Sequence, residues 1–243
     1  MERAGDSGSV ILQPTKINQT STRNRKTMRD MKRDIRTWAI AGAACVSLLP
    51  GTGYTQDHGF YMNAGAGVAL ADQVKLKYFF GPTGGTRLDF DTGARFDISG
   101  GYNFTPFIGI EAETGWVYNS FKNLDASLSH APMMANVVVR YDQPDCRWVP
   151  YAGVGAGGDV SVITLDHAQG NGVIAAGSDA TFQFAWQAFA GVRYRFHPHM
   201  SIGAGYKYYS VDAASWDFAN YNNSIRIGRA NVHSILVEFN WKF

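Results

Sequence analysis

The sequence is poor in cysteine and has no apolar run long enough to cross a membrane as a helix. It contains two cysteines in 243 residues, and Cys45 lies in a segment that we expect to be cleaved off. Cys146 then stands alone, which excludes an intramolecular disulfide and a cysteine-based metal site. The apolar segment from Trp38 to Leu49 has twelve residues, too few for a transmembrane helix. The mean hydropathy of −0.18 is also far from that of a helical membrane protein.

An excess of basic residues is absent from most of the chain. The formal net charge is +2, but residues 1–56 alone hold nine Lys or Arg and four Asp or Glu. From Asp57 onward, thirteen basic residues stand against sixteen acidic ones. The positive balance therefore belongs to the N-terminal leader, and it gives no reason to expect a nucleic-acid partner.

The leader has the three parts of a secretory signal peptide. These are a positive region, an apolar core and a break of small residues, namely Lys32, Arg33 and Arg36, then Trp38 to Leu49, then Pro50 to Gly53. We predict a removed signal peptide over 31–56, cleaved between about Gly53 and Gln56. Residues 1–30 are predicted to be disordered, or to reflect a start codon assigned too far upstream.

The last thirteen residues alternate between apolar and polar side chains. The apolar set is Ile235, Val237, Phe239, Trp241 and Phe243, and the polar set is Ser234, Glu238, Asn240 and Lys242. A strand has a side-chain period of 2, so this segment is predicted to be a strand with one apolar and one polar face. The aromatic end at Phe239, Trp241 and Phe243 resembles the terminal signal by which outer-membrane barrels are recognised for assembly.

Seven further segments precede it, most of them with the same alternation. The eight predicted strands cover 60–71, 87–102, 107–118, 133–142, 149–158, 181–196, 201–210 and 231–243. The connections between them alternate between long and short, which is what a membrane barrel with short periplasmic turns and long outer loops requires. We therefore predict an all-β fold, an eight-stranded antiparallel up-and-down transmembrane β-barrel, over residues 57–243.

The two faces of these strands predict what meets lipid and what fills the lumen. The apolar parity, such as Leu88 to Ile98 with Phe90, is expected to face lipid, with aromatics including Tyr151 at the rims. The charged parity is expected to point inward and form an ion-pair network that closes the lumen. Its members are Arg87, Asp89, Asp91, Arg95, Asp97, Glu111, Glu113, Arg140, Asp142, Arg193, Arg195, Lys207, Glu238 and Lys242. A narrow ion-conducting path is the alternative, because glycines on the same parity leave space.

These residues carry a resemblance to a known group. The signal peptide, the eight segments, the glycine-rich stretch from Pro150 to Gly158 and the terminal strand resemble the eight-stranded outer-membrane barrels. That group includes outer-membrane protein A barrels, opacity-type surface proteins and small "porin family" barrels. The resemblance covers essentially all of 57–243 and implies a location in the outer membrane of a Gram-negative bacterium. It implies architecture more than activity, because members include adhesins, structural anchors and proteins of unknown role.

Four readings of the function compete. A closed structural or adhesin-like surface protein is favoured, and a small porin-like pore for ions or small solutes is the alternative. A lipid A-modifying enzyme is disfavoured, because the neighbours His233 and Ser234 point to opposite faces of a strand and cannot form a catalytic pair. A soluble lipocalin-type barrel is disfavoured because the charged parity is unsuited to a dry cavity. The other histidines are expected in turns and loops, where His197 and His199 form a polar turn.

The partners expected from this reading are membrane components and a surface ligand. We expect contacts with outer-membrane lipid and lipopolysaccharide, and with the barrel-assembly machinery during biogenesis. The long loops 159–180 and 211–229 are the predicted places for a surface ligand. The second holds Trp216, Phe218 and Tyr221 beside asparagines, which suits contact with a glycan or protein, or packing on the barrel rim. No cofactor, metal or catalytic residue is expected.

Overall fold

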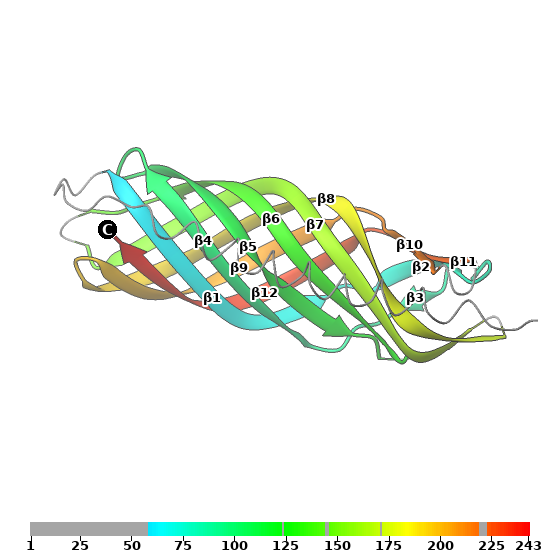
Figure 1. Ribbon diagram of the computed structural model, residues 1–243. Helices are drawn as coiled ribbons and strands as arrows, with labels where there is room; N and C mark the ends of the chain where they lie inside the picture. The colour runs from blue at the N-terminus through cyan, green and yellow to red at the C-terminus, as the bar shows by residue number, and fades with distance from the viewer. Residues whose placement is uncertain (1–57, 123, 144–145, 171, 219–222) are drawn as a thin grey trace, which may run out of the picture. The chain divides into compact units, whose positions relative to one another are not determined.

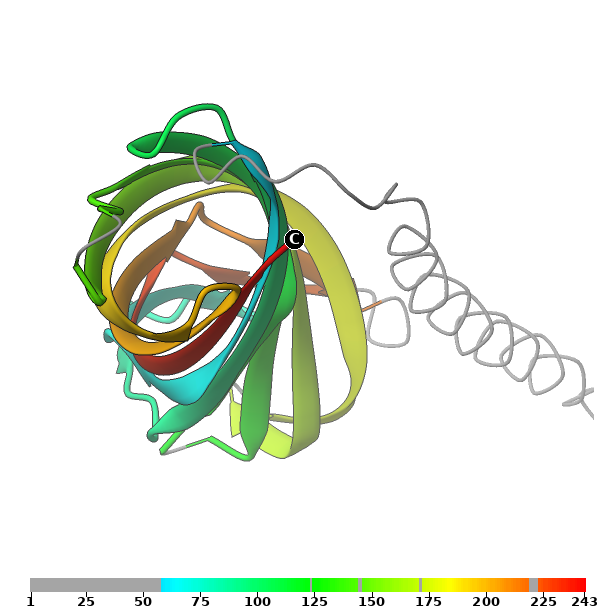
Figure 2. The same cartoon turned by 90° about the vertical axis from the view of Figure 1, so that its left-hand side faces the viewer.

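The fold is a closed barrel of antiparallel strands. The computed structural model describes residues 58–122, 124–143, 146–170, 172–218 and 223–243, so the predicted signal peptide lies outside the described residues. Eight strands close in the order β1-β12-β9-β8-β7-β6-β5-β4, and each neighbouring pair is antiparallel. Figure 2 looks along this ring from the end that holds the C terminus. The predicted eight-stranded barrel is confirmed.

The barrel strands are longest in the middle of the sequence. They are β1 (Gly59–Ala71), β4 (Gly93–Asn103), β5 (Ile108–Ser120), β6 (Ala126–Arg140), β7 (Trp148–Gly170), β8 (Val173–His197), β9 (Met200–Val211) and β12 (Ala230–Lys242). A tilted transmembrane strand needs about 9–11 residues. β7 and β8, with 23 and 25 residues, therefore continue well beyond the membrane on the side opposite the C terminus (Figure 1).

Alternation along the strands separates the lipid-facing surface from the lumen. In β12, Ile235 and Val237 are 58% and 62% exposed, whereas Ser234 and Glu238 are buried inside the barrel. An apolar side chain can face lipid at no cost, and a polar one can be satisfied inside the ring, so this register is strongly favoured. Within the described residues, the chain forms no helix that is both long and apolar enough to traverse a membrane.

Four short strands form a second sheet at the end of the barrel opposite the C terminus (Figure 1). They are β2 (Val74–Phe79), β3 (Arg87–Leu88), β10 (Ser215–Phe218) and β11 (Asn223–Ile227), in the order β10-β11-β2-β3. We call this the cap sheet. β2, β10 and β11 come from the predicted loops 72–86 and 211–229, so the prediction of loops there is wrong, whereas β3 comes from the start of the predicted strand 87–102. Its inward face is apolar, with Leu76, Trp216 and Ile225 buried.

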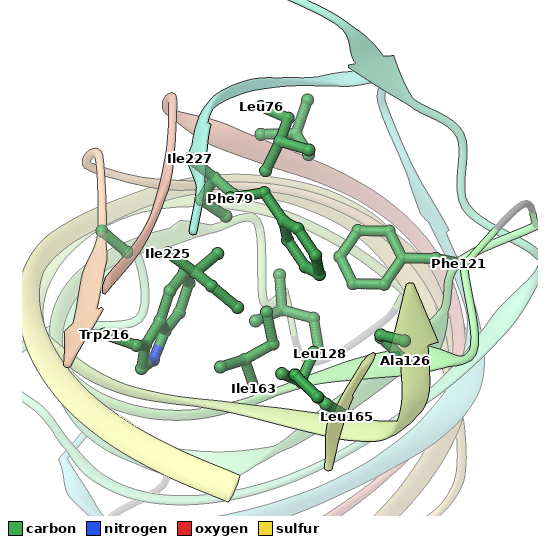
Figure 3. Close-up of a cluster of buried hydrophobic side chains, with 14 of the residues drawn as sticks. Leu76, Phe79, Phe121, Ala126, Leu128, Ile163, Leu165, Trp216, Ile225 and Ile227 are labelled. Atoms are coloured by element: carbon green, nitrogen blue, oxygen red, sulfur yellow. The ribbon is translucent and has the colours of Figure 1, made fainter. Parts of the chain in front are cut away.

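The inward face of the cap sheet packs against the interior of the extended barrel strands. Figure 3 shows Leu128, Ile163 and Leu165 of the barrel wall gathered with Phe79 and Trp216 of the cap sheet. We call this group the apolar cap cluster. Its buried members are Val74, Leu76, Phe79, Phe80, Phe90, Phe121, Ala126, Leu128, Ile163, Leu165, Ala168, Ala175, Ala214, Trp216, Phe218, Ile225 and Ile227. The outer end of the barrel is therefore filled by apolar side chains.

The prediction of a long loop over 159–180 is wrong. β7 and β8 stay paired from Trp148 with Tyr194 up to Gly170 with Val173. The apolar–polar alternation of a membrane strand is absent there because both sides of the strand have a different environment. Ile163 and Leu165 point inward and belong to the apolar cap cluster, while Val162 and Thr164 are half-buried on the outside. Beyond the membrane, the apolar-outside rule no longer applies, so the pattern expected of a membrane strand fails.

The start of the predicted strand 87–102 is also different. The ladder between β1 and β4 ends at Ala69 and Gly93, and Arg87 and Leu88 pair with β2 in the cap sheet instead. Phe90, expected to face lipid, is 8% exposed and packs on Phe121 with ring centroids 4.5 Å apart. Residues before Gly93 lie outside the barrel wall, and the apolar side chains Leu88 and Phe90 pack in the apolar cap cluster instead of facing lipid.

Candidate functional site

Four charged side chains meet in the centre of the lumen. Arg95 Nε lies 3.0 Å from Asp97 Oδ2, and its Nη2 lies 3.1 Å from Glu113 Oε1. Lys207 Nζ lies 2.9 Å from the same Asp97 oxygen and 2.6 Å from Glu113 Oε1. Gln187 Nε2 donates to Glu113 Oε2 at 3.0 Å. All five are buried, and the two cations and two carboxylates neutralise one another, as burial demands.

A second pair lies nearer the C-terminal end of the barrel. Glu238 Oε2 accepts hydrogen bonds from Arg193 Nη2 at 3.1 Å and from the Tyr151 hydroxyl at 2.6 Å. The prediction that Tyr151 belongs to the aromatic rim of the barrel is wrong, because it is 5% exposed and points inward to Glu238. Gly191 and Gly205 make room for it, since a Cβ at either position would lie 2.4 or 2.5 Å from the hydroxyl.

Glu111 is held by neutral donors rather than by a cation. Its Oε2 accepts from Asn63 Nδ2 at 2.8 Å and from the Tyr61 hydroxyl at 3.2 Å, and its Oε1 accepts from Asn136 Nδ2 at 3.1 Å. Asn136 Nδ2 also donates to Glu113 at 3.0 Å. Asn136 therefore joins the central cluster to Glu111 and its partners, so that all of them form one connected polar network.

Three more cations lie where the strands end. Asp142 forms ion pairs with both Arg195 and Lys242. The Arg140 guanidinium stacks over the Tyr61 ring, 4.7 Å from its centroid, and Arg140 is 6% exposed. One carboxylate between two cations, beside a third cation without an ion pair in the described residues, leaves this end of the lumen positive.

The inward placement predicted for Arg87, Asp89 and Asp91 is wrong. Arg87 is exposed on the cap sheet and Asp91 is exposed beyond it. Asp89 accepts a hydrogen bond from Gln73 Nε2 at 2.6 Å outside the lumen. The structure places the other predicted members in the lumen, namely Arg95, Asp97, Glu111, Glu113, Arg140, Asp142, Arg193, Arg195, Lys207, Glu238 and Lys242.

A buried cluster that the sequence reasoning missed lies between the central ion pairs and the apolar cap. His130 Nδ1 is 2.8 Å from Asp159 Oδ2 and 2.9 Å from Ser161 Oγ. The Tyr209 hydroxyl donates to Asp159 Oδ1 at 2.7 Å, and Trp216 Nε1 donates to the Ser161 carbonyl at 3.0 Å. His130 and Asp159 were assigned to predicted loops, so their inward direction could not be inferred. The cluster joins the polar network to the cap sheet.

The sequence comparison with protein families decides what kind of protein this is. The family model described as outer membrane protein beta-barrel domain matches residues 39–243. This protein belongs to the outer membrane protein β-barrel domain family. The resemblance drawn from the terminal strand and the eight segments is thereby confirmed, and the family places the chain in the outer membrane.

Solved structures of other outer-membrane barrels are similar to this outer membrane barrel. OprG from Pseudomonas aeruginosa is 16% identical, with a TM-score of 0.52 over 78% of this chain and 99% of that one. Neisserial surface protein A is 16% identical, with a TM-score of 0.49 over 79% of this chain and 100% of that one. At this identity the likeness to OprG shows the fold alone. No curated protein matches the chain by sequence.

The outer membrane barrel carries its terminal aromatics on the lipid-facing side. Phe239, Trp241 and Phe243 are 39%, 46% and 57% exposed. The rings of Trp241 and Phe243 are stacked with centroids 6.0 Å apart, and Phe243 N donates to the Phe60 carbonyl at 3.0 Å. These side chains do not enter the lumen, and they are available to a partner that approaches from the membrane.

The aromatics predicted to be a loop binding site have another place in this barrel. Trp216 and Phe218 are 0% and 6% exposed in the apolar cap cluster, so of the two readings, packing on the barrel describes them. Tyr221 lies outside the described residues. The side chains on the outward face of the cap sheet remain exposed at this end of the barrel.

Proposed function

We propose that this protein is a closed outer-membrane barrel that acts at the cell surface through the outward face of its cap sheet. Ion-paired side chains fill the centre of the lumen and its C-terminal end, and the apolar cap cluster fills the opposite end. Eight strands enclose a space that side chains fill, whereas an aqueous channel needs about 16 strands. The proposal includes export by the signal peptide over 31–56.

A closed lumen predicts the absence of stable conductance. In planar-bilayer recordings, we expect the purified protein to show no channels of porin size, because the charged network and the apolar cluster occlude the same path in series. A porin of the same membrane, purified in the same detergent, is the positive control. Stable channels of nanosiemens conductance would contradict the closed lumen and would favour the small pore for ions or solutes.

The outward face of the cap sheet is basic, and this observation carries the proposed surface role. Lys75, Lys77, Arg87 and Arg226 are all exposed, against one exposed carboxylate on the four cap strands, Asp217. Outside the barrel interior, the ion pairs of the described residues join Arg229 to Asp212 and His233 to Asp72, so none of the four cations is paired there.

Two of these cations stand directly opposite each other. Lys75 pairs with Arg87 across β2 and β3, and like charges at opposite positions destabilise a sheet. Stability therefore does not explain this arrangement, whereas an anionic partner does. Neighbouring strands lie about 4.8 Å apart, so the face presents closely spaced cations to a chain of repeated negative groups. We infer that the partner is a polysaccharide that carries sulfate or phosphate groups.

Charge reversal on this face is expected to abolish binding to a polyanion. We expect the double variant Lys77→Glu, Arg226→Glu to lose retention on immobilised dextran sulfate, and retention of the unmodified protein to weaken as salt is raised. Both positions are exposed, so the barrel should fold normally. Arg147→Glu is the matched control, because Arg147 is exposed at the opposite end of the barrel. Retention on neutral dextran, or unchanged retention of the double variant, would contradict the proposal.

The remaining functional proposals concern assembly and the membrane. We propose that Phe239, Trp241 and Phe243 serve recognition by the barrel-assembly machinery, and that the apolar outer wall contacts lipid and lipopolysaccharide. Deleting Phe243 should lower the yield in the outer membrane of cells and leave refolding in detergent largely intact, because its ring is 57% exposed and fills no core. Equal yields in cells would count against a role in assembly, and a refolding defect would show a structural role.

No enzymatic role is proposed for the barrel. His130, Asp159 and Ser161 come together, with Ser161 Oγ 2.9 Å from His130 Nδ1 and donating to Asp159 Oδ2 at 2.5 Å. All three are at most 3% exposed, which leaves no approach for a substrate. His233 bonds the Tyr206 hydroxyl at 2.6 Å on the outer wall, whereas Ser234 is buried inside. The first set is therefore closed to a substrate, and the second does not place its hydroxyl beside its base.

A further inference from the structure

A β-bulge in the cap sheet turns one aromatic side chain toward the outward face. Tyr78 of β2 pairs with Arg226 of β11, but the next pair joins Leu76 to Ile227, so Lys77 has no residue opposite it. In a regular strand, neighbours point to opposite faces, and Tyr78 would point inward beside the outward Lys77. The extra residue changes this parity, as bulges do when they re-aim a side chain. Lys77 and Tyr78 therefore lie on the same face, with Arg226 across from the ring.

Burial does not explain an aromatic side chain at this position. Phe79, the next residue, is 2% exposed and belongs to the apolar cap cluster, whereas Tyr78 is half-buried outside that cluster. The Arg226 guanidinium lies 5.9 Å from the centre of the Tyr78 ring, at the outer limit of a cation–π contact. This contact contributes little to holding the ring, so we consider what the ring offers to a partner.

The ring lies among the four cations of the outward face. Lys77 precedes it, Arg226 stands opposite it, and Lys75 and Arg87 form the cross-strand pair further along the same face. Residues two apart on a strand are about 7 Å apart, and neighbouring strands are about 4.8 Å apart. A sugar unit placed on the ring therefore has cations within reach on more than one side.

A neutral aromatic ring does not help to bind a bare anion, because the face of its π-system is negative. The C–H groups on one side of a sugar ring are weakly positive and apolar, so they stack on such a face. The sulfate or phosphate groups of the same sugar can then reach Lys77 and Arg226, where charge-assisted hydrogen bonds form. A ring among cations thus suits a ligand that has both a sugar ring and negative groups.

We propose that Tyr78 is the stacking platform for a sugar ring of the acidic polysaccharide and makes the cap sheet selective for it over chains of bare anionic groups. This inference rests on the proposed function of the cap sheet, because the four cations supply the attraction and the ring supplies the selectivity. Tyr78 is accordingly a specificity-determining residue, and its loss should affect a sulfated polysaccharide and spare a polyanion that has no sugar.

The test compares two immobilised polyanions, dextran sulfate and inorganic polyphosphate, with the full-length protein in detergent at one fixed salt concentration. We expect Tyr78→Leu to weaken binding to dextran sulfate about tenfold, the size of one stacking contact, and to change binding to polyphosphate less than about twofold. Tyr78→Phe should keep the parental affinity for both. Lys77→Gln is the matched control, because loss of a charge should weaken binding to both polyanions.

Tyr78→Leu keeps an apolar side chain at the bulge, and amide exchange in β2 at the parental rate verifies an intact cap sheet. Equal losses for the two polyanions in this variant, or no loss for either, overturn the role of the ring, while retention of the parent on dextran sulfate still supports the proposed function. Failure of the unmodified protein to bind either polyanion overturns both. Tighter binding to single-stranded DNA than to dextran sulfate assigns the ring to stacked bases and overturns the polysaccharide.

Discussion

Replacing Glu113 by alanine is expected to lower the free energy of unfolding by about 3–5 kcal/mol, because it leaves two buried cations without their shared partner. Glu113 Oε1 receives Arg95 Nη2 at 3.1 Å and Lys207 Nζ at 2.6 Å. Its Oε2 receives Gln187 Nε2 at 3.0 Å and Asn136 Nδ2 at 3.0 Å. Asp97 alone cannot neutralise both cations. Urea unfolding of the barrel in detergent measures the loss.

The controls for Glu113→Ala follow from its neighbours. Phe96→Leu on the lipid face should cost much less, because Phe96 is 50% exposed and lipid accepts any apolar side chain. Adding Lys207→Met to Glu113→Ala should recover part of the stability, because it removes one of the two cations left uncompensated. Two outcomes would contradict this account of the central charges. One is a loss of stability in Glu113→Ala no larger than in Phe96→Leu. The other is a double variant whose loss equals the sum of the losses of Glu113→Ala and Lys207→Met measured separately.

The barrel wall could be predicted from the sequence because one physical rule governs it. Inside the membrane each strand has lipid on one side and a filled lumen on the other, so the alternation from Ile235 to Phe243 reports directly on direction. The inward placement of Glu111, Lys207 and Glu238 followed from the same parity. Their partners did not follow, because Lys207 of β9 reaches Glu113 of β5 across the lumen, and strand parity carries no information on contacts between strands that are not neighbours.

The outer part of the molecule could not be predicted because the rule changes there. Beyond the membrane, β7 and β8 have an apolar inside and a mixed outside, so Ile163 and Leu165 no longer alternate with polar neighbours in the expected sense. The cap sheet is built from strands of two to six residues, too short for a period to be recognised. Asp159 of β7 and His130 of β6 fell in predicted loops, so their inward placement could not be predicted, although Asp159 completes the charge balance of the lumen.

The apolar cap cluster predicts the second large effect, at Trp216. Trp216 is 0% exposed and donates a hydrogen bond to the Ser161 carbonyl of β7 at 3.0 Å. We expect Trp216→Ala to reduce the free energy of opening the cap sheet by about 3–5 kcal/mol, since it removes a large buried ring and leaves a cavity. The barrel ladder does not depend on this ring, so the loss should be local.

Two measurements distinguish local opening of the cap from global unfolding in Trp216→Ala. Amide hydrogen exchange should become faster in β2, β10 and β11 while β5 and β12 stay protected, and trypsin should gain access to Lys77 and Arg226 on the cap sheet. The matched control is Trp116→Ala, because Trp116 is 48% exposed on the outer wall and its removal leaves no internal cavity. Equal exchange rates in β2 for both variants would mean that the cap sheet is held by its own hydrogen bonds and not by packing on Trp216.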